Sequence, residues 1–192
     1  MVDPAGFHRG GERCLGRGRA ANYASFSNAS SFHIYGEALK RGAAIDLVHI
    51  PYKGESLQLI DLIGGQVGRS WNSIGTAMPQ LKSRRVRALA LVGAVRSKVM
   101  PEVPTFAELG VPRLDTNGWF GMLAPAGTPR AIVDKIAADT AQVLATPEVA
   151  DSLRAQGLEP TGLQPESFAR FIREDLRRWK TLTQELSIRL EN

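Results

Sequence analysis

From Ala21 onward, strand-like stretches alternate along the chain with stretches that have the apolar spacing of helices. This alternation predicts an α/β fold with a mainly parallel sheet, because two parallel strands need a crossover connection such as a helix. The expected strands cover residues 22–25, 46–51, 66–71, 86–92 and 118–124. The sequence Gly68-Arg69-Ser70 interrupts the third of these strands.

Helix signals occupy the intervals between the strands. The expected helices cover residues 33–41, 56–63, 76–82 and 105–109, and three more begin at Thr128-Pro129, Thr146-Pro147 and Gln164-Pro165. Thr105 and Glu108 have the spacing of a capping box. We expect the apolar residues of three helices to face inward: Leu57, Leu59, Ile60 and Ile63; Ile132, Val133, Ile136, Val143 and Leu144; and Phe168, Phe171, Ile172, Leu176, Trp179 and Leu186.

A polar loop joins the first strand to the first helix, and it is the strongest indication of a binding site. A strand, a loop of small residues and a helix together direct free backbone N–H groups at an anion. The hydroxyls of Ser30 and Ser31 add donors, so a carboxylate could be held there without a lysine. Ser25, Ser30 and Ser31 could bind it directly or through water, or could simply cap the helix, and the two roles are compatible.

Eight further sequence motifs follow one another in a recognisable order. They are Tyr23-Ala24-Ser25 with Ser30 and His33, Gly36-Glu37, Pro51-Tyr52-Lys53-Gly54, Gly64-Gly65-Gln66-Val67, Val86-Arg87-Ala88-Leu89-Ala90, Pro101-Glu102-Val103-Pro104-Thr105, Trp119-Phe120-Gly121 and Ala124-Pro125-Ala126-Gly127-Thr128-Pro129. This ordered set resembles the Bug family, the extracytoplasmic solute receptors of tripartite tricarboxylate transporters. The resemblance covers roughly Ala21 to the C-terminus.

The resemblance implies a two-lobed fold of the type II periplasmic-binding-protein class, with the N-terminal part of the first lobe missing. Residues 21–115 would form part of lobe 2, and residues 116–192 the returning C-terminal part of lobe 1. The implied ligand is a small organic acid, such as a di- or tricarboxylate, an amino acid or an aromatic acid. A membrane permease would be the partner of a monomeric, periplasmic receptor that needs no cofactor or metal.

By the same resemblance, the ligand-binding residues would be Ser25, Ser27, Asn28, Ser30, Ser31, His33, Tyr52, Lys53 and Asn72. Tyr52 and Lys53 could close over the ligand, or Lys53 could be a solvated charge, and Asn72 could bind or simply end a strand. The family loop generally reads Pro-Gly-x-Gly where this chain has Phe26-Ser27-Asn28-Ala29. Losing both glycines restricts positive φ and brings Cβ atoms toward the anion site.

The first twenty residues differ from the rest, because they are rich in Gly and Arg and lack hydrophobic periodicity. We expect residues 1–20 to be disordered. They include no apolar core of a signal peptide, so a chain expressed as written would stay in the cytoplasm. The alternative to a binding receptor is therefore a truncated, non-binding remnant of one.

The net charge of +5 raises a second alternative, a basic nucleic-acid-binding protein. Much of the excess lies in residues 1–20 and in Arg84, Arg85 and Arg87, without interleaved aromatic residues, so we do not expect nucleic acid as a partner. Enzymatic sites are also disfavoured. No nucleophile-elbow sequence surrounds Ser30 in a triad with His33 and Asp46, and His33 and His49 lack the helical spacing of metal ligands.

Overall fold

The computed structural model describes residues 21–111, 113–115 and 118–188. It divides into two compact units, one formed by residues 1–117 and 183–192 and the other by residues 118–182. The expected assignment of two lobes stays a prediction, and the expected disorder of residues 1–20 lies outside the described residues. No helix in the described ranges is both long and apolar enough to cross a bilayer.

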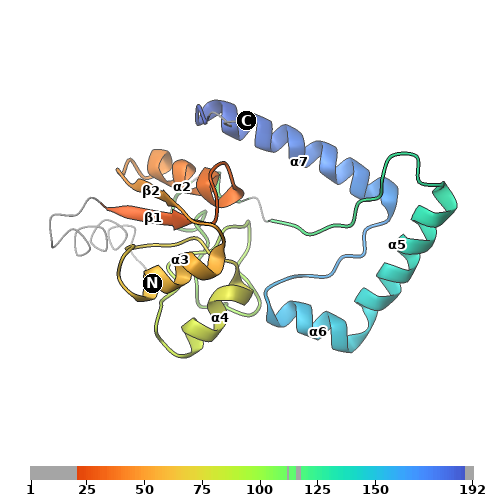
Figure 1. Ribbon diagram of the computed structural model, residues 1–192, viewed down its shortest axis with the longest axis horizontal. Coiled ribbons are helices and arrows are strands. Elements are labelled where there is room, and N and C mark those ends of the chain that lie inside the picture. Colours follow the sequence, from red (N-terminus) through yellow and green to blue (C-terminus); the bar gives the residue numbers. More distant parts are fainter. Residues whose placement is uncertain (1–20, 112, 116–117, 189–192) are drawn as a thin grey trace. The chain divides into compact units, whose positions relative to one another are not determined.

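The first unit is built on a short parallel sheet. Strand β1 (Asn22–Ser25) pairs in parallel with β2 (Val48–Pro51), in a register that places Tyr23 opposite His49. Helix α2 (Ser31–Gly42) forms the crossover between them, as predicted (Figure 1). The strand expected over residues 66–71 is reduced to one parallel bridge between Ala24 and Ser70. The N–H of Gly68 donates instead to the side chain of Asn22 (2.8 Å), so the ladder does not extend further.

Helices α3 (Glu55–Ile63) and α4 (Ile74–Lys82) follow the sheet segments. The inward face expected for α3 is wrong in part: Leu59 is buried, but Leu57 and Ile60 are 51% and 63% exposed. The fully buried residue beside Leu59 is Gln58, whose amide donates to the carbonyl of Trp71. This polar anchor turns the helix so that Leu57 and Ile60, three positions apart, share the solvent face.

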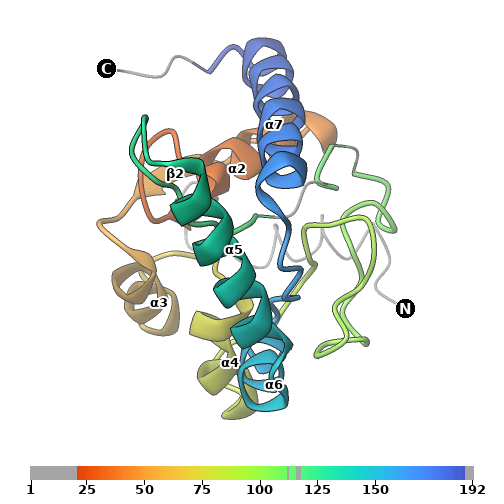
Figure 2. The ribbon, with the colours of Figure 1, turned by 90° about the vertical axis from the view of Figure 1, so that its right-hand side faces the viewer.

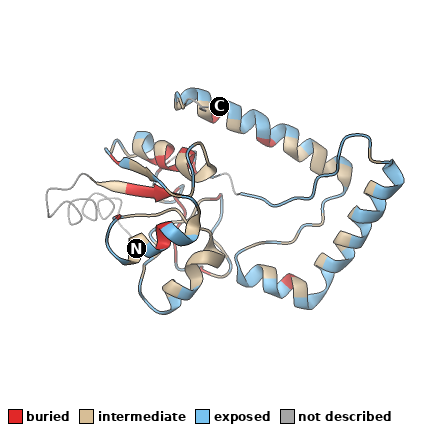
Figure 3. Ribbon diagram, viewed as in Figure 1, coloured by how far each residue is buried: buried red, intermediate tan, exposed pale blue. Residues whose placement is uncertain are grey.

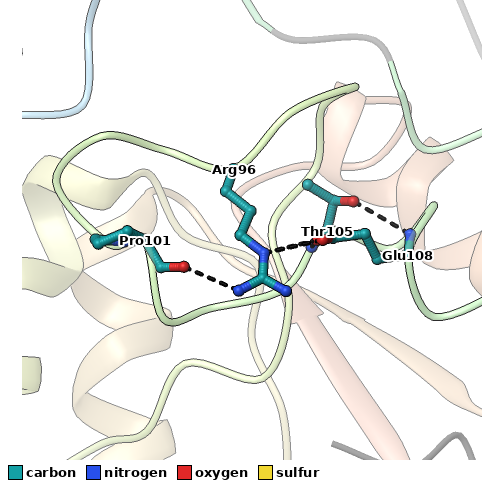
Figure 4. Close-up of polar contacts among 4 residues, drawn as sticks. All are labelled: Arg96, Pro101, Thr105 and Glu108. Carbon is teal, nitrogen blue, oxygen red and sulfur yellow. Dashed lines mark hydrogen bonds and ion pairs between the residues drawn. The ribbon is translucent and has the colours of Figure 1, made fainter. Parts of the chain in front are cut away.

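Residues 83–115 contain neither of the elements expected there. The strand over residues 86–92 is wrong, because only an isolated bridge between Leu91 and Thr105 forms. The helix over residues 105–109 is also wrong, although its capping box exists (Figure 4): Glu108 N–H donates to Thr105 Oγ1 (3.2 Å) and Thr105 N–H to Glu108 Oε2 (2.7 Å). Gly110, at φ +76°, ends this turn before a helix develops.

Arg96 fixes the same turn from outside. Its Nε donates to both carboxylate oxygens of Glu108 at 2.9 and 3.0 Å, and its Nη1 donates to the carbonyl of Pro101 at 3.0 Å (Figure 4). These bonds raise the pKa of Arg96 and lower that of Glu108. The long connection is therefore held by turns and side chains rather than by a sheet.

The second unit contains α5 (Arg130–Ala145), α6 (Pro147–Ala155) and most of α7 (Pro165–Glu185). A sharp turn joins α5 to α6 (Figure 1, Figure 2), and the element bounds place it at Thr146. The starts of these helices are close to those predicted, but the capping hydroxyls are not used. Thr128 Oγ1 donates to the carbonyl of Pro125 (2.8 Å) and Thr146 Oγ1 to that of Val143 (2.7 Å).

The apolar stripes of the second unit have little cover. Within its described residues, only Ala150, Asp175 and Leu182 are buried (Figure 3). The inward face expected for α5 is wrong in part: Ile132, Ile136 and Val143 are exposed, whereas Val133 and Leu144 are half-buried. Leu176 of α7 is exposed too, whereas the other predicted residues of its stripe are half-buried. Residues 118–124 form no paired strand, contrary to the prediction, because no second strand lies beside them in the described chain.

Candidate ligand-binding site

Three loops meet in the first unit at the carboxyl ends of parallel segments. The loop after β1 and the loop after β2 are joined by backbone hydrogen bonds from Tyr52 N–H to Ser25 O (2.8 Å) and from Gly54 N–H to Phe26 O (3.3 Å). Asn72 follows the third parallel segment, which bridges Ala24 through Ser70. In parallel α/β sheets, ligands bind outside the carboxyl ends of the strands, so this edge is the candidate site.

Helix α2 begins at this edge and is capped by the loop. The Oγ of Ser30 accepts a hydrogen bond from the His33 N–H at 3.2 Å, and it donates to the carbonyl of Ser27 at 2.8 Å. The N–H groups of Ser31 and Phe32 stand in the first turn, where the helix supplies no acceptor. Together with the positive end of the helix dipole, they are the donors best placed for an anion.

The loop itself adopts a left-handed conformation at one residue, Ala29, with φ +56°. The predicted difficulty of losing two glycines therefore applies at Ala29 and not at Ser27. The N–H of Ala29 donates to Nδ1 of His33 at 3.0 Å, so His33 packs under the loop. Ser27 and Asn28 are exposed, and Ser27 Oγ donates to the carbonyl of Asn28 at 2.9 Å.

A layer of rings and hydroxyls supports the loop from below. Ser25 is fully buried; its Oγ donates to Ser27 O (2.9 Å) and lies 2.7 Å from Nε2 of His49. The rings of His33 and His49 are stacked with centroids 4.0 Å apart, and Tyr23 stacks on His49 at 5.0 Å. Ser25 thus braces the loop rather than facing solvent.

This layer keeps both imidazoles neutral. Burial, and after it the charge of the neighbouring His33, lower the pKa of His49 to about 4. The pKa of His33 is also lowered, mainly by burial, while Glu37 opposes and Lys40 adds to that shift. A neutral His33 can accept the Ala29 N–H through Nδ1, so the protonation state and the loop geometry agree.

The remaining expected residues lie on the neighbouring loops. Lys53 is exposed, whereas the hydroxyl of Tyr52 donates to Asp61 Oδ2 (2.7 Å) and is directed at α3. Burial and Asp61 raise the pKa of Tyr52 to about 12. Asn72 is half-buried; its Oδ1 accepts from Gln58 (3.2 Å) and its Nδ2 donates to Ser70 (2.9 Å).

Several residues at this edge were not identified from the sequence. Ser73, one residue after Asn72, caps α4 by accepting from Thr76 N–H (3.4 Å) and donates its own N–H and Oγ to Glu55 at 2.9 and 2.8 Å. The Ser73–Thr76 spacing was the available signal, but the predicted helix began two residues too late. Gln58 has a buried Oε1 without a hydrogen-bond partner. The single amide side chain among the apolar residues of α3 was the sequence signal that could have identified Gln58.

The geometry gives no support to catalysis. Ser25 and His49 are close enough to act as nucleophile and base, but the hydroxyl is fully buried and is bonded to Ser27. Ser30 meets the backbone of His33 rather than its ring. The described ranges contain no group of three His, Cys, Asp or Glu side chains arranged to hold a metal ion. The set of nine ligand residues stays a prediction, with eight of them exposed or half-buried and Ser25 buried beneath.

Comparison with known proteins agrees with the motif order. Residues 18–188 match the family described as "Tripartite tricarboxylate transporter family receptor". A Pseudomonas protein from the tcbD-tcbE intergenic region is 33% identical over 165 residues, covering 85% of this chain and 49% of that protein. BugT of Bordetella pertussis is 32% identical over 181 residues, covering 93% of this chain and 55% of BugT. The chain thus spans about half the length of these curated relatives.

Solved structures show the same fold. A periplasmic transporter superposes with a TM-score of 0.87 at 32% identity, covering 100% of this chain and 63% of that one. Rpa4515 of R. palustris, solved with adipate, gives 0.84 at 28% identity, covering 98% and 62%. MatC of Rhodopseudomonas palustris, solved with bound malate, gives 0.77 at 27% identity, covering 94% and 61%. The fold is therefore that of periplasmic solute-binding proteins, and the chain belongs to the receptor family of tripartite tricarboxylate transporters.

Proposed function

We propose that this chain supplies a carboxylate-binding part of a periplasmic solute receptor that delivers a small organic acid to a tripartite tricarboxylate transporter. Family membership supports the receptor role, and relatives solved with adipate and malate support an organic acid as the ligand. A membrane permease is the proposed partner. Because the chain spans about half of its curated relatives, these statements concern the receptor to which its residues contribute.

The observation that carries the proposal is the start of α2. Ser31 and Phe32 present N–H groups that the helix does not use, at the carboxyl end of a parallel sheet. A carboxylate needs such donors, and each hydrogen bond to a charged group contributes about 1.5–3 kcal/mol. The exposed residues Ser27 and Asn28 border the same space, and Lys53 and Asn72 are the proposed contacts from the neighbouring loops.

Within this proposal, the expected residues divide into two roles. Ser27, Asn28, Ser30 and Ser31 would face the ligand from the loop and the first turn of α2. Ser25 and His33 would hold the loop from beneath, because their side chains already bond Ser27 O and Ala29 N–H.

A proline at residue 31 tests the backbone donor directly. Ser31 is the first residue of α2, a position that tolerates proline, and Ser30 has the extended conformation (φ −70°, ψ 162°) that a residue before proline requires. Ser31→Pro removes the N–H while leaving the helix start intact. By calorimetry with malate, adipate, citrate and glutamate, we expect affinity for the bound acid to fall about 10- to 100-fold.

Ser31→Ala is the matched control, because it removes the hydroxyl and keeps the N–H. Affinity retained in Ser31→Ala and lost in Ser31→Pro supports backbone capture of the carboxylate. Equal loss in both variants would assign the contact to the hydroxyl. If none of the four acids binds the unsubstituted chain or raises its Tm, the non-binding alternative replaces the proposal. Salt-sensitive retention on DNA would favour the nucleic-acid alternative instead.

A further inference from the structure

Two polar residues on one face of α3 hold the loop that follows the third parallel segment. Glu55 and Gln58 lie three positions apart, so their side chains share a face of the helix. The carboxylate of Glu55 accepts the N–H and the Oγ–H of Ser73 at 2.9 and 2.8 Å. On the other side of Asn72, the Trp71 N–H donates to a carbonyl of β1 at 3.1 Å. The backbone on either side of Asn72 is therefore fixed, and only its side chain is left to be oriented.

The surroundings of Gln58 allow its amide only one orientation. The side chain is fully buried, and its Nε2 donates to the carbonyl oxygen of Trp71. A carbonyl oxygen can only accept hydrogen bonds, so the atom of the Gln58 amide beside it must be the nitrogen. Turning the amide by half a rotation would set two oxygens against each other. Nε2 also donates to Oδ1 of Asn72, at 3.2 Å.

The orientation of Gln58 in turn sets that of Asn72. Because the Gln58 atom that faces Asn72 is a donor, the atom of Asn72 that meets it must be the oxygen. The Nδ2 of Asn72 then lies at the other corner of the amide, where it donates to Oγ of Ser70 at 2.9 Å. Ser70 alone could not set this orientation, since a hydroxyl group can both donate and accept. Gln58 therefore decides which way the Asn72 amide points.

This orientation leaves Asn72 with a donor to offer. The amide nitrogen has two hydrogens, and Ser70 accepts one of them. Among the described residues, the second hydrogen on Nδ2 has no acceptor. Asn72 is half-buried and follows the third parallel segment at the carboxyl edge that forms the candidate site. An N–H at this edge attracts a carboxylate, whereas the amide oxygen would repel it.

The chemistry of Gln58 matters here more than its size. Its Oε1 is buried without a hydrogen-bond partner in the described chain, and such an atom lowers the stability of a fold. An apolar side chain of similar shape, such as methionine, would fill the same space without that cost. What methionine could not do is donate to Trp71 and Asn72 together. The function of the amide is thus to orient its neighbour.

We propose that Gln58 is a positioning residue of the candidate site, which turns the Asn72 amide so that an N–H rather than an oxygen faces the carboxylate of the ligand. The inference rests on the proposed function, because it takes Asn72 as a contact of the organic acid. It adds a donor from the third parallel segment to the backbone donors at the start of α2. Gln58 is fully buried and acts only through Asn72.

A double-mutant cycle tests the inference by calorimetry with malate, adipate, citrate and glutamate. Asn72→Ala removes the donor and should weaken binding of the bound acid about tenfold. Gln58→Met removes the amide that orients Asn72 at nearly the same volume, and it should weaken binding several-fold. In the double variant the loss should equal that of Asn72→Ala alone, because no Asn72 side chain is left to orient. A purely structural role of Gln58 would add a further loss.

Gln80→Met is the matched control, because the Gln80 side chain contacts Arg85 (3.5 Å) instead of Asn72, and affinity should stay unchanged. The orientation can also be followed by NMR in the ligand-free chain. Nuclear Overhauser effects between the side-chain N–H of Asn72 and the β-protons of Ser70 should be strong in the unsubstituted chain. They should weaken in Gln58→Met, where the amide can adopt both orientations.

The outcomes separate this inference from the proposed function. Unchanged affinity in Asn72→Ala would overturn the inference and leave carboxylate capture at the start of α2 in place. A loss in Gln58→Met that persists in the Asn72→Ala background would also overturn it, as would an Asn72 amide signal that Gln58→Met does not change. If none of the four acids binds the unsubstituted chain, the proposed function fails and the inference fails with it.

Discussion

Replacing Ala29 by glycine should stabilise the chain and improve the candidate site together. Ala29 holds φ at +56°, a left-handed conformation that costs an L-residue about 1–2 kcal/mol. Glycine removes this cost, but it also makes the unfolded chain more flexible, which lowers the free energy of unfolding by about 0.4–1 kcal/mol. The net gain in the free energy of unfolding is therefore about 1 kcal/mol, or about 3 °C in Tm for a chain of this size.

Ala44 provides the matched control. It also has a positive φ, +51°, but it lies after the C-terminal end of α2, at the opposite end from the candidate site. Ala44→Gly should raise the free energy of unfolding by a similar amount and leave ligand affinity unchanged. Ala29→Gly should additionally strengthen carboxylate binding several-fold, because the loop then holds its binding conformation at lower cost and no Cβ borders the anion.

Urea denaturation and calorimetry of both variants separate the two effects. The strain argument predicts a higher denaturation midpoint for each, with an unchanged slope. A lower midpoint for Ala29→Gly would refute the reasoning about strain. A shift in affinity for Ala44→Gly equal to that of Ala29→Gly would show that the change in binding reflects general stability rather than the loop.

Two further outcomes follow from buried polar groups. The pKa of His49 is about 4 in the folded chain and about 6.5 in the unfolded chain, so the unfolded chain binds more protons between these pH values. The free energy of unfolding should therefore fall by about 2 kcal/mol as the pH drops from 6.5 to 4. Urea denaturation midpoints measured against pH would test this, and His49→Gln should flatten the profile. Asp175→Leu removes the acceptor that the indole N–H groups of Trp119 and Trp179 share, and it should lower the free energy of unfolding by about 3 kcal/mol. Asp175→Asn keeps an acceptor and should lower it by about 1 kcal/mol. Tryptophan fluorescence during denaturation would measure both changes.

Local signals in the sequence identified the elements whose formation depends on nearby residues. The strand ending at Ser25, helix α2 with its serine cap, and the proline starts of α6 and α7 were all predicted within two or three residues. In these cases the capping and turn residues lie within a few positions of the boundary they set. The family was likewise evident from the sequence, because eight short motifs in order are specific together although each one alone is weak.

Prediction failed where an element depends on distant partners. Residues 86–92 have the composition of a buried strand, yet only Leu91 finds a bridge, because a strand requires a neighbour with free backbone groups. The α3 face was wrong in part, because the contacts of Gln58 with Trp71 and Asn72 outweigh the apolar pattern of Leu57 and Ile60. The spacing of residues along the chain could identify neither a neighbouring strand for residues 86–92 nor Trp71 as the partner of Gln58.

The candidate site shows the same division between local and distant information. Its serine loop was found from sequence, because a polar loop before a helix is a local signal. Its support was not found, because His33 and His49 come from different elements and meet only through the β1–β2 register, which sets Tyr23 opposite His49. The ring of His33, which accepts the Ala29 N–H, is stacked on the ring of His49, which contacts the Ser25 hydroxyl. The loop that would hold a carboxylate is thus shaped by the same packing that stabilises the sheet, so a substitution in the histidine pair should change stability and affinity together.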